Sequence, residues 1–193
     1  MSLGAWEVKV STNFPQKVAT GIAQLDEQLI GAEYNAVAYL GSQVVNGTNH
    51  AVLAQQTILT GRDTKNAVVL VFNEKPKSIE VALASINTIV KGNNEPGGID
   101  VNVTTEIPAE AKAALDAALK GFVGSKVEAF AYIGKQVTKG IDYIFACEVT
   151  PVVQDPVKTI SLVKVHSIDN TLEFKALFSD EKNNTKLGYA FNW

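Results

Sequence analysis

The stretch YLGSQVVNGTNH, residues 39–50, has the pattern of a β-hairpin, because strand-like residues flank Asn46-Gly47, a pair that suits the positive φ of a tight turn. Part of this stretch recurs as YIGKQVTKGIDY, residues 132–143, with Tyr, Gly, Gln, Val and Gly at the same spacings. A turn alone requires only one or two glycines. The recurrence therefore indicates a repeated structural unit, of which the hairpin is one part.

The repeat continues on both sides of the hairpin at a constant offset of 93 residues. The matched pairs include Gly4 with Gly97, Pro15 with Pro108, Ala36-Val37-Ala38 with Ala129-Phe130-Ala131, and Ile79-Glu80-Val81 with Leu172-Glu173-Phe174. Two copies are fewer than a solenoid needs. The segment 91–96, KGNNEP, is polar and contains Gly and Pro, as linkers do. We therefore predict two homologous domains, residues 4–90 and 97–193, although residues 179–193 have no counterpart in the first copy.

Each copy has the same order of predicted elements. A short alternating strand, at 6–11 or 99–104, precedes a helix with one apolar stripe, formed by Val18, Ile22, Leu25 and Leu29 in the first copy and by Ala111, Leu115, Ala118 and Phe122 in the second. Four strand-like runs follow, at 34–45, 48–59, 67–72 and 78–84, and again at 127–138, 141–152, 160–165 and 171–178. An antiparallel meander covered by one helix is an α+β arrangement, which is the fold class that we predict.

The composition excludes several classes of protein. The net charge of -3 gives no basic footprint for a nucleic acid. No apolar run approaches the roughly 18 residues that a membrane span requires. The single cysteine, Cys147, rules out an internal disulfide framework. Together with the start MSLGAWEV, which lacks the pattern of a signal peptide, it favours the cytoplasm, and secretion after removal of a leader stays open.

The histidines and the cysteine do not predict a catalytic or metal site. Cys147 and the two histidines, His50 and His166, fall on unrelated residue types in the other copy, and no nucleophile–base pair is indicated. Metal-ligand spacings and glycine-rich phosphate loops are also absent from the sequence. We therefore expect a protein that is not an enzyme and that binds no cofactor and no metal.

The hairpin and its flanks resemble those of the cystatins, which are inhibitors of papain-like cysteine proteases. Gln43-Val44-Val45-Asn46-Gly47 is similar to the Gln-Val-Val-Ala-Gly hairpin of that family, and Val71-Phe72 followed by Pro76 resembles the second hairpin of its single-domain intracellular branch, the stefins. The resemblance covers most of residues 4–85 and, more weakly, 97–178. It implies two tandem cystatin-like domains, each with one helix packed on a curved antiparallel β-sheet.

The resemblance also implies a steric mechanism that needs no catalytic residue. Three segments form a wedge that fills the protease cleft beside the catalytic cysteine. The apolar pair Val44-Val45 gives the wedge a stiff tip that loses little entropy on burial, and Gln43 is placed to hydrogen-bond across the hairpin. Mapped onto the first copy, the protease-binding residues are Gly4, Ala5, Gln43, Val44, Val45, Asn46, Gly47, Asn73, Glu74, Lys75 and Pro76.

The second copy departs from the family pattern at the tip. Its weaker equivalents are Gly97, Gln136, Val137, Thr138, Lys139 and Gly140, in which Thr138-Lys139 replaces an apolar pair, and its second hairpin has no proline. We therefore expect inhibition mainly through the first copy. The alternative is a protein-binding or structural module that keeps the fold and inhibits nothing. We expect a monomer, with a domain-swapped dimer as the alternative.

Three tripeptides match the acceptor pattern for N-glycosylation, beginning at Asn46, Asn102 and Asn183. A glycan on Asn46 would stand at the tip of the first hairpin and would block docking into a cleft. Protease binding by this hairpin therefore implies that the chain does not meet the glycosylation machinery.

Overall fold

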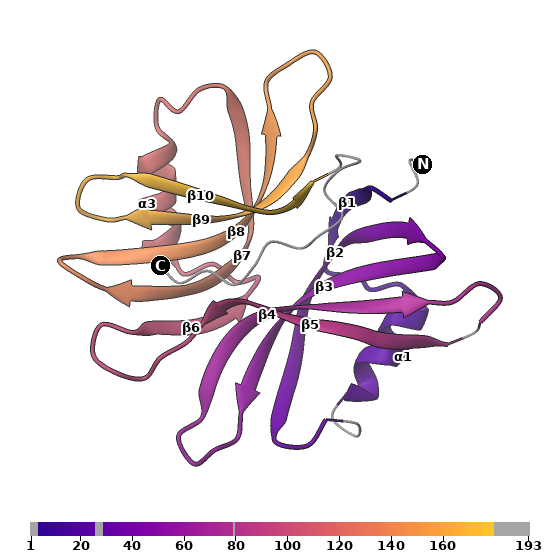
Figure 1. The fold of residues 1–193 in the computed structure, drawn as a ribbon. Helices are drawn as coiled ribbons and strands as arrows, with labels where there is room; N and C mark the ends of the chain where they lie inside the picture. Colours follow the sequence, from indigo (N-terminus) through magenta and orange to yellow (C-terminus); the bar gives the residue numbers. More distant parts are fainter. Residues whose placement is uncertain (1–3, 26–28, 79, 180–193) are drawn as a thin grey trace.

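The computed structural model describes residues 4–25, 29–78 and 80–179. Figure 1 shows two groups of strands, one from each half of the chain, with one helix beside each group. Ile79, the predicted glycosylation site at Asn183 and the segment 180–193 of the second predicted domain lie outside the described residues.

The first half forms a five-stranded antiparallel sheet in the order β1-β2-β3-β4-β5. The helix α1 (Gln16–Ala23) lies between β1 and β2 in the sequence. The strands are β1 (Trp6–Ser11), β2 (Ala32–Val45), β3 (Gly47–Ile58), β4 (Thr64–Glu74) and β5 (Val81–Lys91).

The second half repeats this order with β6 (Ile99–Thr104), α3 (Ala109–Leu119), β7 (Ser125–Val137), β8 (Ile141–Pro151), β9 (Thr159–His166) and β10 (Leu172–Ser179). Its sheet has the order β6-β7-β8-β9-β10 and is also antiparallel. Two antiparallel sheets with a helix in each half confirm the α+β class predicted from the sequence.

Each helix begins directly after a proline. Pro15 and Pro108 adopt nearly the same extended conformation, and their carbonyl oxygens accept the first helical hydrogen bonds, from Ala19 and Lys112, at 2.9 Å each. Because proline has no N–H to leave unpaired, it is well tolerated at this boundary. The four apolar residues of the first predicted stripe all join the cluster that lies between the helix and the first sheet. Val18 and Ile22 belong to α1, and Leu25 and Leu29 follow its last residue, Ala23.

Two predicted elements were placed wrongly. The helix α3 ends at Leu119, so Phe122 does not continue its apolar stripe; the Phe122 side chain is 40% exposed and stacks on Phe174 with ring centroids 5.6 Å apart. The fifth strand of the first sheet is β5, Val81–Lys91, and not 78–84. The outward residues of β5 are small or polar, so its alternation is weak. Its most deeply buried residues, Ile89 and Val90, lie between the predicted strand and the predicted linker at 91–96.

The bulges in the first three strands of each sheet occur at matched positions. The register shifts between Val8 and Ser11, between Ala36 and Ala38, and between Tyr39 and Gly41, and it shifts at the residues 93 positions later in the second sheet. A bulge bends a strand and is built into a fold rather than accidental. The common structure of the copies therefore includes the irregularities of these three strands, whereas β4 and β5 have two register shifts and β9 and β10 have one.

The repeated glycine of the opening stretch is explained by a close approach of two strands. A Cβ atom on Gly41 would lie 2.1 Å from the backbone oxygen of Glu7, and one on Gly134 would lie 2.4 Å from that of Asp100. Glycine lets β1 and β6 pair with the bulged strands beside them.

We predict that Gly41→Ala and Gly134→Ala each lower the free energy of unfolding by about 1–3 kcal/mol, because the added methyl group must displace the neighbouring strand. Urea denaturation followed by circular dichroism measures the effect. An unchanged midpoint at either position would contradict the close approach.

The second hairpins of the two copies differ in length. Leu83 of β5 lies opposite Phe72, whereas Leu172 of β10 lies opposite Val165, which matches Phe72 at the offset of 93. Leu83 and Leu172 therefore occupy equivalent positions, but they are 89 residues apart and not 93. The second hairpin of the first copy is thus four residues longer. The predicted match of 79–81 with Leu172-Glu173-Phe174 was therefore wrong.

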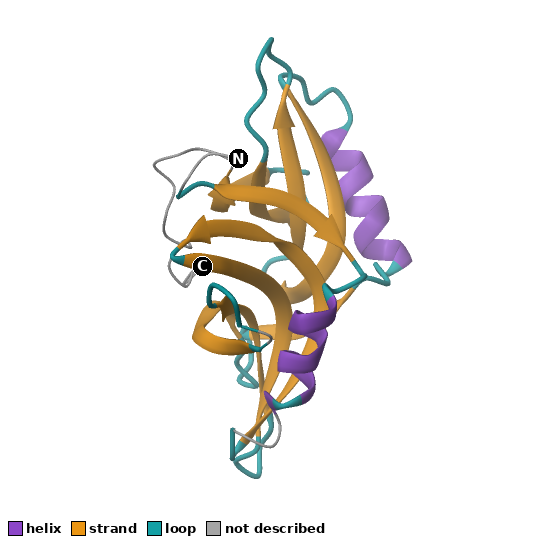
Figure 2. Cartoon of the chain, turned by 90° about the vertical axis from the view of Figure 1, so that its right-hand side faces the viewer, coloured by secondary structure: helices purple, strands orange, loops and turns teal. Residues whose placement is uncertain are grey.

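The two sheets share one hydrophobic core. A single cluster contains buried residues of both, including Leu53 and Val69 of the first sheet and Ile144 and Leu162 of the second. Two contacts cross between the sheets: the ring centroids of Trp6 and Phe178 are 4.9 Å apart, and the Val103 N–H donates to Gln55 Oε1 at 3.0 Å. Figure 2 shows the helices outside the strands, and none of the residues of the shared cluster belongs to a helix. The layers are therefore helix, sheet, sheet and helix.

The segment between the two halves is a compact turn. The Gly92 N–H donates to Asn66 Oδ1 at 3.1 Å, the Asn93 N–H to the Ile99 oxygen at 3.0 Å, and the Gly98 N–H to the Glu95 oxygen at 2.9 Å. These bonds tie the turn to both sheets. The division into domains 4–90 and 97–193 stays a prediction. Because the two halves share a core, the question to test is whether each half folds without the other.

Candidate functional site

The N-terminal segment of the first copy lies directly on its first hairpin. The Gly4 N–H donates to the Val44 oxygen at 3.0 Å, and the Gly4 oxygen accepts from Gln43 Nε2 at 2.9 Å. Ala5 is only 9% exposed, so little of its side chain is free for contact with a partner. Two of the three predicted segments are therefore in contact, and Val44 beside them is half-buried.

The tip of the first hairpin packs against the second hairpin. Gly47 has a φ of +108°, and a Cβ atom there would lie 2.2 Å from the backbone oxygen of Glu74 and 3.2 Å from Cδ of Pro76. Only glycine fits both this conformation and this contact. The side chains of Val45 and Asn46 at the tip are exposed, with Val45 at 37%. The third predicted segment thus joins the other two at one end of the sheet.

A row of side-chain amides connects these segments on the face toward the second sheet. Gln43 Oε1 accepts from Asn49 Nδ2 at 3.1 Å, and Asn49 Oδ1 accepts from Asn73 Nδ2 at 2.8 Å. Through Gln43 Nε2 the row continues to the Gly4 oxygen. The predicted role of Gln43 in hydrogen bonding across the hairpin is confirmed, and the bonds extend over three strands and the N-terminal segment.

The second hairpin turns at Lys75–Ser78. The Ser78 N–H donates to the Lys75 oxygen at 3.1 Å, with Pro76 as the first central residue and Lys77 as the second. Lys77 has a φ of +63°, which a type II turn requires and which glycine or asparagine usually supplies. Lys75, Pro76 and Lys77 are exposed, so this turn presents a proline between two lysines to solvent.

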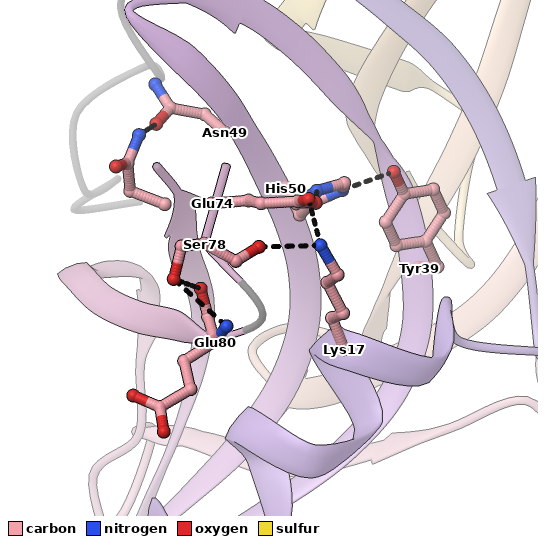
Figure 3. A network of polar contacts seen from close by, with 8 residues as sticks. Lys17, Tyr39, Asn49, His50, Glu74, Ser78 and Glu80 are labelled. Carbon is pink, nitrogen blue, oxygen red and sulfur yellow. Dashed lines mark hydrogen bonds and ion pairs between the residues drawn. The ribbon is translucent and has the colours of Figure 1, made fainter. Parts of the chain in front are cut away.

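On the face toward α1, four side chains form a polar network (Figure 3). Lys17 Nζ is bonded to Glu74 Oε1, and it donates to the Ser78 oxygen at 2.9 Å. Glu74 Oε2 lies 3.4 Å from His50 Nε2, and His50 Nδ1 lies 3.0 Å from the Tyr39 hydroxyl. The sequence did not reveal this network, since Lys17 and Glu74 are 57 residues apart and neither is part of an apolar stripe.

Burial and hydrogen bonding determine the protonation states of the side chains in this network. Burial lowers the pKa of His50, and burial also raises the pKa of Tyr39. The hydrogen bond from Lys17 is the main cause of a lowered pKa for Glu74. At neutral pH the network is therefore an ion pair, Lys17 with Glu74, backed by a neutral histidine and a neutral tyrosine.

The second copy keeps the scaffold but not the tip. Gln136 Nε2 donates to the Gly97 oxygen at 2.8 Å, as Gln43 does to Gly4. The hairpin tip is exposed and polar, with the Val137 side chain 61% exposed beside Thr138 and Lys139. A Cβ atom on Gly140 would lie 2.6 Å from the Ile168 side chain, so the two hairpins of this copy also touch.

Charged groups replace the amide row in the second copy. Asp142 and His166 stand at the positions of Asn49 and Asn73; His166 Nδ1 lies 2.8 Å from Asp142 Oδ1, and His166 Nε2 lies 3.0 Å from Glu173 Oε1. A hollow of about 510 Å³ opens between the two hairpins of this copy, and Asp142 and His166 are among the residues that line it. This end of the second sheet is therefore concave, with charged side chains among the residues that line it.

The His166 imidazole should make the stability depend on pH. Hydrogen bonding to Glu173 is the main cause of its raised pKa, with Asp142 also raising the pKa and Lys164 opposing. A histidine whose pKa is higher in the folded state stabilises the fold below its unfolded pKa, and this contribution is lost as the pH rises through the folded pKa. Asp169, in the same hairpin, also faces this charge.

We predict that His166→Gln lowers the free energy of unfolding more at about pH 5 than at about pH 8, because only the charged imidazole pairs with both carboxylates. Denaturation of the variant and the wild-type protein at both pH values gives the difference. An equal loss at the two pH values would show that the bonds to Asp142 and Glu173 do not favour the charged imidazole.

The single cysteine lies in the core of the second half. Cys147 is fully buried, and this burial raises the pKa of its thiol, which makes it a poor nucleophile. Among the described residues, no group of three or more His, Cys, Asp or Glu side chains could hold a metal ion. No helix in that part of the chain is long and apolar enough to cross a membrane.

No protein-family model matches the chain, and no curated protein is significantly similar to it. The interpretation of the site therefore rests on the geometry and on the residues that resemble the cystatin hairpins.

Proposed function

We propose that the protein inhibits papain-like cysteine proteases sterically, through one end of the first sheet. The observation that carries this proposal is the contact between three sequence-distant segments: Gly4 lies on the first hairpin, and Gly47 of that hairpin lies on Glu74 and Pro76. These are the segments that the cystatin resemblance assigns to the wedge. Each half has a helix and an antiparallel sheet, which supports a cystatin-like fold for both copies.

The geometry suits a rigid, uncleaved wedge. The amide row and the Gly4 bonds order the three segments before any partner binds, so little conformational entropy is lost on docking. Val45 at the tip supplies exposed apolar surface for the centre of an interface. Catalytic residues are not needed, because the wedge acts by occupying the cleft.

The second copy suits protease binding less well. Its tip carries Lys139 where the first copy has Asn46, and its hairpins enclose a hollow with Asp142 and His166 rather than a continuous edge. This concave surface, with charged side chains among its lining, favours the second candidate function for that copy, a non-inhibitory protein-binding module. We therefore assign inhibition mainly to the first copy.

An inhibition assay tests the proposal. The intact protein, at micromolar concentration and after preincubation, is expected to reduce papain activity on a small peptide substrate, and mass spectrometry of the mixture is expected to show an uncut chain. Unchanged papain activity would remove the proposal and leave the binding module as the better account.

A further inference from the structure

A single lysine of α1 contacts both ends of the loop that forms the second hairpin. Lys17 Nζ is bonded to Glu74, the last residue of β4, and donates at 2.9 Å to the oxygen of Ser78, which closes the turn. Figure 3 shows the lysine reaching from the helix to both acceptors. The Lys17 side chain is 40% exposed and lies outside the apolar stripe, so it contributes little to the packing of the helix.

Among its described residues, the loop has few other hydrogen bonds. Its internal bonds are local: the Ser78 N–H donates to the Lys75 oxygen, and Ser78 Oγ is bonded to Glu80. The turn also contains Lys77 at positive φ, which is unfavourable for a residue with a side chain. Among the described residues, the hydrogen bonds that join loop 75–80 to another element run through Lys17. The lysine is therefore the main polar restraint on where this loop stands.

Two further side chains fix the carboxylate that Lys17 binds. His50 Nε2 lies 3.4 Å from Glu74 Oε2, and the Tyr39 hydroxyl lies 3.0 Å from the other ring nitrogen of His50. Both Tyr39 and His50 are buried, so they provide a rigid backing for Glu74. The restraint on the loop is thus connected to the core of the first sheet.

The second copy provides an internal comparison. At the offset of 93 it has Glu110 in place of Lys17, Ser167 in place of Glu74 and Tyr143 in place of His50. Its second hairpin is also four residues shorter, as the 89-residue spacing of Leu83 and Leu172 against the offset of 93 shows. The lysine restraint therefore accompanies the longer hairpin, in the copy to which we assign inhibition.

We propose that Lys17 is a positioning residue, which holds the second hairpin beside the tip of the first and thereby increases the affinity of the wedge for its protease. The effect on affinity rests on the proposed function. The effect on the hairpin does not, because it is a property of the free protein.

The test compares Lys17→Met, Lys17→Arg and a matched control, Lys112→Met, which removes an exposed lysine of α3 that pairs with Asp116 at 2.7 Å. The first readout is amide exchange at Ser78 in the free protein, measured by NMR. We expect Lys17→Met to speed this exchange, Lys17→Arg to restore it, and Lys112→Met to leave it unchanged. The second readout is inhibition of papain, which Lys17→Met is expected to weaken about tenfold, mainly through faster dissociation.

The outcomes separate the two claims. Unchanged Ser78 exchange in Lys17→Met would overturn the positioning role, whether or not the protein inhibits papain. Faster exchange with unchanged inhibition by the same variant would overturn the link to affinity. Failure of the wild-type protein to inhibit would overturn the proposed function, while Ser78 exchange would still decide whether Lys17 holds the hairpin.

Discussion

Replacing Val44 and Val45 with Asp is expected to abolish protease inhibition. In the complex both side chains would be taken out of water at the centre of the contact, and an unpaired buried carboxylate costs several kcal/mol. Since about 1.4 kcal/mol corresponds to a tenfold change in affinity, we expect the inhibition constant to rise more than about a hundredfold. Steady-state kinetics with papain measures the change.

The matched control is the same pair of substitutions at Val137 and Thr138, which we expect to change inhibition little. Because Val44 is half-buried, Val45→Asp alone serves as a second variant that leaves the hairpin packing intact. Thermal unfolding of each variant checks that its fold is kept. Loss of inhibition from the second pair only would reverse the assignment and make the second copy the inhibitor.

Leu162→Ala is expected to destabilise the whole chain and not only the second sheet. Leu162 is fully buried in the core that the two sheets share. Removing a buried leucine side chain typically costs about 2–5 kcal/mol, because the surrounding residues close the cavity only in part. In a chain of this size that loss lowers the melting temperature by about 5–15 °C.

Calorimetry and hydrogen exchange distinguish one cooperative unit from two. We expect one transition in both proteins, and faster exchange in the variant for the central amides of β3 and β4 as well as for those of β8 and β9. Val152→Ala, at a residue that is 75% exposed, is the control and should change neither. Two separate transitions, with the first sheet unaffected, would support independent domains.

The local structure could be predicted from the sequence better than the packing. The opening strands, the helix starts after Pro15 and Pro108 and the first hairpin follow from residue type and short-range spacing. The shared core is indicated in the sequence by two uninterrupted apolar runs, which a search for alternating apolar and polar residues does not detect. The runs 51–54 and 67–72 are apolar without interruption, and such a run indicates a strand that is buried on both faces. Ala51 and Leu53 face the second sheet, while Val52 and Ala54 face α1.

The constant offset of 93 residues between the copies does not reveal the length of the second hairpin. Side chains alternate with a period of two along a strand, so a shift of four residues places every apolar residue on the same face as before. The match of 79–81 with Leu172-Glu173-Phe174 therefore satisfied the pattern while the register was wrong. The register depends on the turn, and the turn depends on contacts such as the bond from Lys17 to Ser78, which no local pattern reports.

The most direct test of the account is an amide-exchange footprint of the protein bound to papain. The account predicts protection at three segments of the first copy, Gly4–Ala5, Gln43–Gly47 and Asn73–Pro76, and none at Gln136–Gly140 of the second. Absence of a complex, or a footprint confined to the second copy, would contradict it.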